Sequence, residues 1–173
     1  RGLGDVYKRQ LCILAGCIGW GSARANQEKD RVRHLRTLFH ILGQMRGEVS
    51  YGRHTLPEIC LLLAELNCGC YNSCFLRIYE RTGEESGKDF ARVWEEEMGD
   101  CLARLPLRED EREAVAGLPK TMNFREEDGQ SGRIGQAEAF LEGRYRQAEE
   151  TYENRSKMIR SISILTVSYT HLR

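Results

Sequence analysis

A helical stripe of apolar residues in the first third of the chain is the feature that most restricts its fold. From Ala23 onward, apolar side chains recur at steps of three and four residues, and the pattern ends at Tyr51 and Gly52. The stripe consists of Val32, Leu35, Phe39, Leu42, Met45 and Val49. This spacing places one apolar face along a single long helix. Because no later segment shows the alternation typical of strands, we predict an all-α fold.

The remaining sequence indicates five more helices. They are expected at 56–66, in a short stretch ending near 83, at 86–105, at 108–122 and from 134 to the C-terminal end. Pro119 should kink or shorten the fifth helix, and the glycine-rich, charged segment 125–132 is predicted to be a loop. The inward stripe of the last helix is Ala137, Phe140, Leu141, Tyr145, Ala148 and Tyr152. We therefore predict a bundle of about six helices with long first and last members.

Both ends of the chain resemble translated sequencing-adapter DNA. Residues 5–10 (DVYKRQ) can be written as the codons GAT GTG TAT AAG AGA CAG. The reverse complement of this DNA, read two bases further on, encodes Val-Ser-Tyr-Thr-His and the start of a Leu codon, which is the sequence of residues 167–172. We therefore expect residues 1–10 and 166–173 to be non-native tails that carry no information about the fold.

The sequence just inside each tail is apolar. Residues 11–22 (LCILAGCIGWGS) and 158–165 (MIRSISIL) are each shorter than the roughly 20 residues that span a bilayer. Basic residues flank both stretches on the side that faces the middle of the chain. We interpret the two stretches as truncated transmembrane helices, and the positive-inside rule then predicts that the domain 23–157 faces the cytoplasm.

The segment YGRHTLPE, between the first two expected helices, holds the densest cluster of structural signals. Gly52 suits a helix C-cap, and Thr55 and Glu58 have capping-box spacing with a proline between them. These signals favour a helix–helix corner, and the functional alternative is that Arg53 and His54 are exposed there and contact a partner. The candidate partner-binding or structural corner consists of Tyr51, Gly52, Arg53, Leu56, Pro57 and Glu58.

Seven cysteines raise the question of a metal or thiol site. Four of them, which could converge as thiolate ligands near one turn, are Cys60, Cys68, Cys70 and Cys74. The C-x2-C spacing of structural zinc sites is missing, and no histidine lies close in sequence. We favour free thiols in a reducing compartment and keep a metal site as the alternative.

No catalytic or cofactor-binding pattern stands out in the sequence. The glutamates at 95–97 follow Trp94 on a helix, where a solvated face is a simpler interpretation than paired catalytic carboxylates. The 26 basic and 26 acidic residues balance, and without the tails 22 basic residues face 25 acidic ones, which argues against binding to polyanions. We therefore expect no enzyme activity, no cofactor, no small-molecule substrate and no nucleic-acid partner.

Several motifs in a consistent order carry a family resemblance. Residues 31–58 combine an Arg-rich helix with a Y-G-R-x-x-L-P-E corner, and Trp94 follows on a middle helix. Further along, GLPKT at 117–121 precedes DGQ at 128–130, and KMIRS at 157–161 leads to the C-terminal apolar stretch. Together these motifs resemble the stage III sporulation protein AB family of endospore-forming Firmicutes, with Pro119 in place of that family's usual glycine.

The resemblance implies a membrane protein with one helix at each end and a cytoplasmic helical domain, similar to the module of the type II secretion and type IV pilus platform protein. The implied role is a non-enzymatic scaffold of the channel complex between mother cell and forespore, on the mother-cell side of the forespore outer membrane. The implied partners are other stage III sporulation proteins, including a secretion-type ATPase. The alternatives are a fragment of a secretion or pilus platform and a cysteine-dependent metal or thiol protein.

Overall fold

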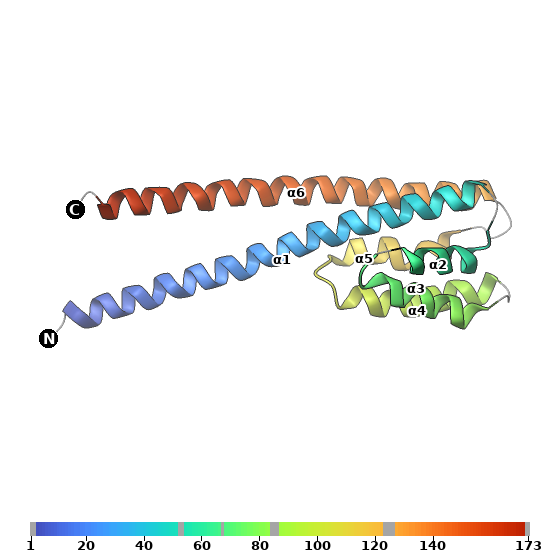
Figure 1. Cartoon of the computed structure of the whole chain (residues 1–173), viewed down its shortest axis with the longest axis horizontal. Coiled ribbons are helices and arrows are strands. Elements are labelled where there is room, and N and C mark those ends of the chain that lie inside the picture. Colours follow the sequence, from blue (N-terminus) through green and yellow to red (C-terminus); the bar gives the residue numbers. More distant parts are fainter. Residues whose placement is uncertain (1–2, 52–53, 67, 84–86, 123–126, 172–173) are drawn as a thin grey trace.

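Two long helices run the length of the molecule, close together at one end and further apart toward the chain termini (Figure 1). The computed structural model describes residues 3–51, 54–66, 68–83, 87–122 and 127–171. The long helices are α1 (Leu3–Tyr51) and α6 (Glu127–His171). They are antiparallel, so both chain termini lie at the same end of the molecule (Figure 1). Their mutual contact is the most extensive between any two described elements.

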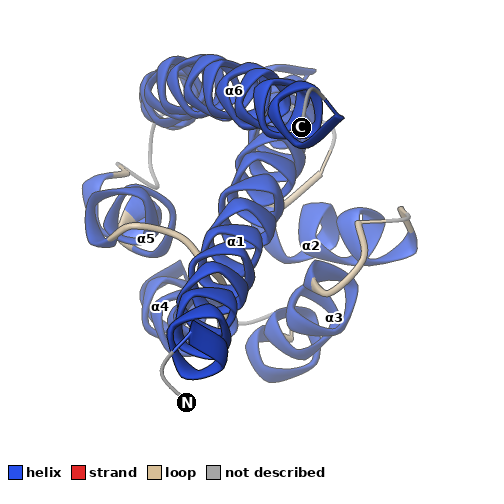
Figure 2. Cartoon of the chain, turned by 90° about the vertical axis from the view of Figure 1, so that its left-hand side faces the viewer, coloured by secondary structure: helices blue, strands red, loops and turns tan. Residues whose placement is uncertain are grey.

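Four short helices and one 3₁₀ helix pack at the end away from the termini (Figure 1). They are α2 (Leu56–Glu65), α3 (Tyr71–Thr82), α4 (Gly87–Ala103), α5 (Glu109–Ala116) and the 3₁₀ helix η1 (Leu118–Thr121). Viewed end-on, α1 lies among the other helices, with α6 on one side and α2–α5 around the rest (Figure 2). The described residues form no strand. The prediction of an all-α bundle of about six helices with long first and last members is confirmed.

Pro119 divides the predicted fifth helix into two parts. The helix α5 ends at Ala116, and after Gly117 the chain continues as η1, with Pro119 in its first turn. Proline has no amide hydrogen and its ring blocks the preceding turn, so an α-helix through this position is disfavoured. The prediction that this proline shortens the helix is confirmed.

The predicted loop at 125–132 is wrong, because α6 begins at Glu127. Residues 123–126 lie outside the described part of the chain. The glycines at 129 and 132 lie inside α6 despite a helix propensity about 1 kcal/mol poorer than that of alanine. Packing of α6 along α1 overrides this local preference.

Most residues of the predicted apolar stripes of the two long helices are buried or half-buried, and Phe140 is the one that is exposed. Leu35, Leu42 and Met45 of α1 are buried in the core. Phe140 of α6, predicted to face inward, is 37% exposed. The Arg144 guanidinium lies 5.1 Å from the Phe140 ring centroid, so a cation–π contact covers part of this ring at the surface.

Trp94 occupies the core of the short-helix end. Its side chain is fully buried, and its ring centroid lies 6.0 Å from that of Phe75 and 5.8 Å from that of Phe90. The indole Nε1–H donates to the carbonyl oxygen of Val115 at 3.0 Å. This bond satisfies a buried donor and joins α4 to α5.

A buried ion pair joins α1 to α5. The Arg31 Nε–H donates to the Glu111 carboxylate at 3.2 Å, and the Arg31 Nη2 forms a second bond to the same carboxylate. The Glu111 side chain is 0% exposed and that of Arg31 is 7% exposed. Glu111 also accepts the backbone N–H of Arg108 at 2.9 Å, so it caps the first turn of α5 as well. One carboxylate thus sets both the start of α5 and its position on α1.

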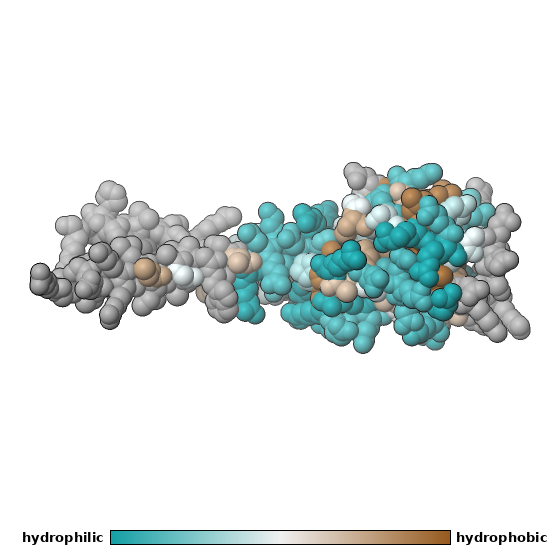
Figure 3. Space-filling model, turned by 90° about the horizontal axis from the view of Figure 1, so that it is seen from below, coloured by the Kyte–Doolittle hydropathy of each residue, from teal (hydrophilic) through white to brown (hydrophobic). Residues whose placement is uncertain are grey.

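The glutamates at 95–97 form ion pairs with basic side chains of neighbouring elements. The pairs are Arg77–Glu97, Arg81–Glu96, Arg81–Glu97 and Lys120–Glu95, each with an N–O distance of 2.6 Å. The arginine pairs connect α3 to α4, and the Lys120–Glu95 pair connects η1 to α4. On the face seen from the α3–α4 side, the residues that the structure describes are mostly hydrophilic, with separate hydrophobic areas (Figure 3).

The two stretches interpreted as truncated transmembrane helices continue α1 and α6 without a break. Residues 11–22 are helical within α1, and residues 158–165 are helical within α6. Within the described part of the chain, no helix combines the length and the apolar character needed to cross a membrane.

Removal of one partner of the Arg31–Glu111 pair should strongly destabilise the fold. We expect Glu111→Gln to lower the free energy of unfolding by about 3–5 kcal/mol, because the buried guanidinium then keeps only its 3.4 Å pair with the partly exposed Glu28. Urea denaturation measures this change. The double variant R31M/E111L should recover most of the loss, since two apolar side chains leave no buried charge.

The control for this prediction is Glu142→Gln on the surface of α6, which breaks the i,i+4 pair Arg146–Glu142. We expect the control to change the free energy of unfolding by less than about 1 kcal/mol. An equal effect of Glu111→Gln and Glu142→Gln would contradict a stabilising role for the buried pair.

Candidate functional site

The predicted corner lies where α1 ends and α2 begins. Tyr51, the last residue of α1, is 78% exposed. Leu56 is buried in the core, whereas Pro57 is half-buried in the first turn of α2. Gly52 and Arg53 fall outside the described residues. The corner therefore contains one strongly exposed aromatic residue beside residues that shape the turn.

The start of α2 is capped by a glutamate. The Glu58 carboxylate accepts the backbone N–H of Thr55 at 2.6 Å and the Thr55 hydroxyl at 2.9 Å. Thr55 is extended, with φ −72° and ψ 159°, as expected of an N-cap residue. The backbone hydrogen bond from Thr55, followed by that from its hydroxyl, lowers the pKa of Glu58. The main interaction of Glu58 is therefore with its own helix.

A histidine–carboxylate contact lies on the α1 side of the corner. The His54 Nε2 lies 4.0 Å from a Glu48 carboxylate oxygen, which makes an ion pair when the imidazole is protonated. Both side chains are more than one third exposed. The corner thus carries a carboxylate on each of the two helices that it joins.

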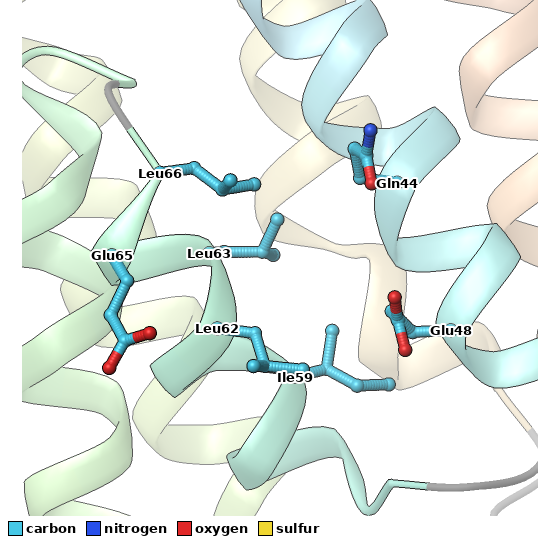
Figure 4. A pocket seen from close by; sticks show the side chains of 7 residues that line it. All are labelled: Gln44, Glu48, Ile59, Leu62, Leu63, Glu65 and Leu66. Atoms are coloured by element: carbon cyan, nitrogen blue, oxygen red, sulfur yellow. The ribbon is translucent and has the colours of Figure 1, made fainter.

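An apolar groove lies between α1 and α2, next to the corner (Figure 4). It encloses about 360 Å³ and is lined by Gln44, Glu48, Ile59, Leu62, Leu63, Glu65 and Leu66. Ile59 and Leu63 are buried at its floor, whereas Leu62 is 36% and Leu66 is 43% exposed. The groove therefore combines an accessible leucine surface with the carboxylates of Glu48 and Glu65.

Sequence reasoning missed this groove, although the composition of α2 carries a signal for it. The helix LPEICLLLAE is apolar on nearly all sides. A helix at the edge of a small bundle buries only one face, so an all-round apolar helix leaves leucines uncovered. Which leucines remain uncovered depends on how α2 lies against α1, and that is a tertiary property.

The four cysteines considered as metal ligands have different surroundings. Cys60 and Cys74 are buried, Cys68 is partly buried, and Cys70 is exposed. Burial raises the pKa of Cys60 well above that of an ordinary thiol. Among the described residues, no group of three or more His, Cys, Asp or Glu side chains is arranged to hold a metal ion.

The cap interaction of Glu58 predicts a pH-dependent contribution to stability. Because folding lowers the pKa of Glu58, this contribution is present above the unfolded-state pKa of about 4.3 and is lost as the pH falls below it. We expect Glu58→Gln to lower the urea midpoint at pH 7 and to have a smaller effect near pH 3. Glu80→Gln, at an exposed site on α3, is the control. A pH-independent difference between wild type and Glu58→Gln would contradict the prediction.

Comparison with known proteins identifies the family. The family model for stage III sporulation protein AB matches residues 10–167. Stage III sporulation protein AB from Bacillus subtilis (strain 168) is 24% identical over 164 residues, which cover 94% of this chain and 92% of that protein. A solved structure of stage III sporulation protein AB superposes with a TM-score of 0.61 at 22% identity, covering 72% of this chain and 97% of the other. The chain therefore belongs to the stage III sporulation protein AB family.

Proposed function

We propose that this chain is a non-enzymatic scaffold of the channel complex between mother cell and forespore, and that it docks a secretion-type ATPase. Family membership over residues 10–167 supports a role in sporulation. The same match favours the sporulation family over a fragment of a secretion or pilus platform. In this role the chain works by association: it holds other stage III sporulation proteins in place while the ATPase turns over.

Membrane anchoring is part of the proposal. We propose residues 11–22 and 158–165 as the inner ends of two transmembrane helices, and 1–10 and 166–173 as non-native tails. Both proposed spans lie toward the same end of the molecule, which is the arrangement that two anchors in one membrane require (Figure 1). The domain 23–157 would then face the cytoplasm on the mother-cell side of the forespore outer membrane.

The observation that carries the docking proposal is an exposed surface at the opposite end, which we name the α1–α2 surface. It consists of Tyr51, the neighbouring corner and the groove that includes Leu62 and Leu66. Exposed aromatic side chains such as that of Tyr51 are enriched at protein–protein interfaces. From Ala23 to Tyr51 an α-helix rises about 40 Å, so a partner bound there would lie well clear of the bilayer.

Arg53 is the corner residue proposed to contact the ATPase. We expect Arg53→Ala to leave the melting temperature nearly unchanged and to weaken co-purification of the ATPase encoded in the same genome. Arg146→Ala, at an exposed position on α6, is the control for the loss of one surface charge. Unchanged co-purification would reject a role of Arg53 in ATPase binding. A large drop in melting temperature would show that Arg53 stabilises the fold instead.

The groove gives an independent test of the same surface. We expect Leu62→Glu to reduce the affinity for the ATPase about tenfold, since a charge replaces an apolar contact. Leu76→Glu, at a 42% exposed leucine on α3, is the matched control and should leave the affinity unchanged. Calorimetric titration measures both affinities. Equal losses in the two variants would contradict a specific role for the groove, and no binding by the wild type would reject ATPase docking altogether.

A further inference from the structure

The groove between α1 and α2 has a distribution of charge that restricts what can bind in it. Its leucines lie between Glu65, on the α2 side, and Glu48, on the α1 side (Figure 4). Among the described residues, those that line the groove include no basic side chain. The groove is therefore apolar in the middle and acidic along both edges. This arrangement favours a ligand with an apolar centre and positive charge on both sides.

Both acidic edges are accessible to a partner. Glu65 is exposed at the end of α2, and within the described part of the chain no basic side chain forms an ion pair with it. The Glu48 side chain is 37% exposed, and its contact with His54 is 4.0 Å long, which is at the limit for an ion pair. Each carboxylate can therefore pair with a cation that a bound molecule brings to its edge.

The elements that build the groove favour a helix as its occupant. A bound strand would need a sheet edge for its backbone hydrogen bonds, and the described residues form no strand. A polyproline segment would need aromatic side chains, and the described residues that line the groove include none. Two neighbouring helices instead form a furrow in which a third helix packs its side chains between theirs.

The apolar residues of α2 set the length of helix that fits. They recur at three- and four-residue steps, as Ile59, Leu62, Leu63 and Leu66. From the first to the last of them the chain advances roughly 10 Å, which is about two helical turns. A bound helix therefore contacts the groove through about two or three apolar side chains, three or four positions apart.

We propose that the groove binds an amphipathic helix of the partner, whose apolar face is flanked by lysine or arginine on both sides. The apolar side chains of that helix cover Leu62 and Leu66, and its basic residues pair with Glu48 and Glu65. An acidic helix is rejected, since like charges would face each other at both edges. The inference rests on the proposed function in one respect, because it takes the helix to belong to the secretion-type ATPase.

The test uses two synthetic peptides and the full-length chain. Each peptide is about 14 residues long, carries leucines at i, i+3, i+4 and i+7, and is held helical by a side-chain staple, since short helices are marginal in water. One peptide has lysines on both flanks of the leucine face, and the other has glutamates there. We expect fluorescence anisotropy to show about tenfold tighter binding of the lysine peptide, with a preference that falls as salt is added.

Charge reversal in the chain should reverse this preference. We expect the double variant E48K/E65K to bind the glutamate peptide more tightly than the lysine peptide, by about tenfold. Leu62→Ser should weaken the binding of both peptides, because both use the same apolar floor. Glu80→Lys, at an exposed position on α3, is the matched control and should keep the preference of the wild type. Circular dichroism checks the fold of each variant.

Several results would overturn the proposal. These are equal affinities of the two peptides, no binding of either peptide, or a preference that is the same in E48K/E65K and in the wild type. A wild type that dimerises in light scattering, while Leu62→Ser stays monomeric, would make a second copy of this chain the occupant. If E48K/E65K does not fold, the two affinities of the wild type decide the question.

Competition separates this inference from the docking proposal. We expect the lysine peptide to displace the ATPase from the chain. If the ATPase binds but the lysine peptide does not displace it, the basic helix is rejected and ATPase docking stands. If the lysine peptide binds with the expected preference but the ATPase does not bind, docking is rejected and the recognition of a basic helix stands.

Discussion

The buried pair between Arg31 and Glu111 is the interaction on which the arrangement of the short helices depends. A guanidinium removed from water needs a counter-charge, and the Glu111 carboxylate meets that of Arg31 with two hydrogen bonds. The same carboxylate caps α5 through the Arg108 amide. A shift of α5 along α1 would therefore break an ion pair and a helix cap together. Trp94 extends this constraint to α4 through its bond to Val115, and the Arg77 and Arg81 pairs extend it to α3.

The long helices α1 and α6 have a different role, because they separate the two ends of the molecule. They pack on each other most closely at the end with the short helices, and they bring both termini to the other end (Figure 1). The corner and the α1–α2 groove lie at the end with the short helices. This separation of the two ends is compatible with the scaffold role that we propose, with membrane anchors at one end and a binding surface at the other. The apolar groove remains because α2 lies at the edge of the bundle, where α1 and α3 cannot cover all of its apolar surface.

Local patterns in the sequence were sufficient wherever the structural cause is local. The apolar stripe of α1 defines a helix because its period matches 3.6 residues per turn, and Leu35 and Met45 are buried as that period requires. Pro119 prevents α5 from continuing because it has no N–H. Glu58, three residues after Thr55, caps the start of α2 by accepting the Thr55 backbone N–H. The apolar pattern predicted a buried Phe140, but this residue is exposed. A helix that packs along one partner leaves the residues at the edge of its apolar face in contact with solvent.

The amino-acid sequence by itself therefore determines the all-α class, the approximate number of helices, the corner between α1 and α2 and the family resemblance. These follow from contacts between residues a few positions apart. Tertiary packing decides the rest, because each remaining feature joins residues distant in sequence. Arg31 meets Glu111 across 80 positions, and Leu62 stays exposed because of the way α2 lies on α1. Such partners share no sequence period, so only the packing of helices can bring them together.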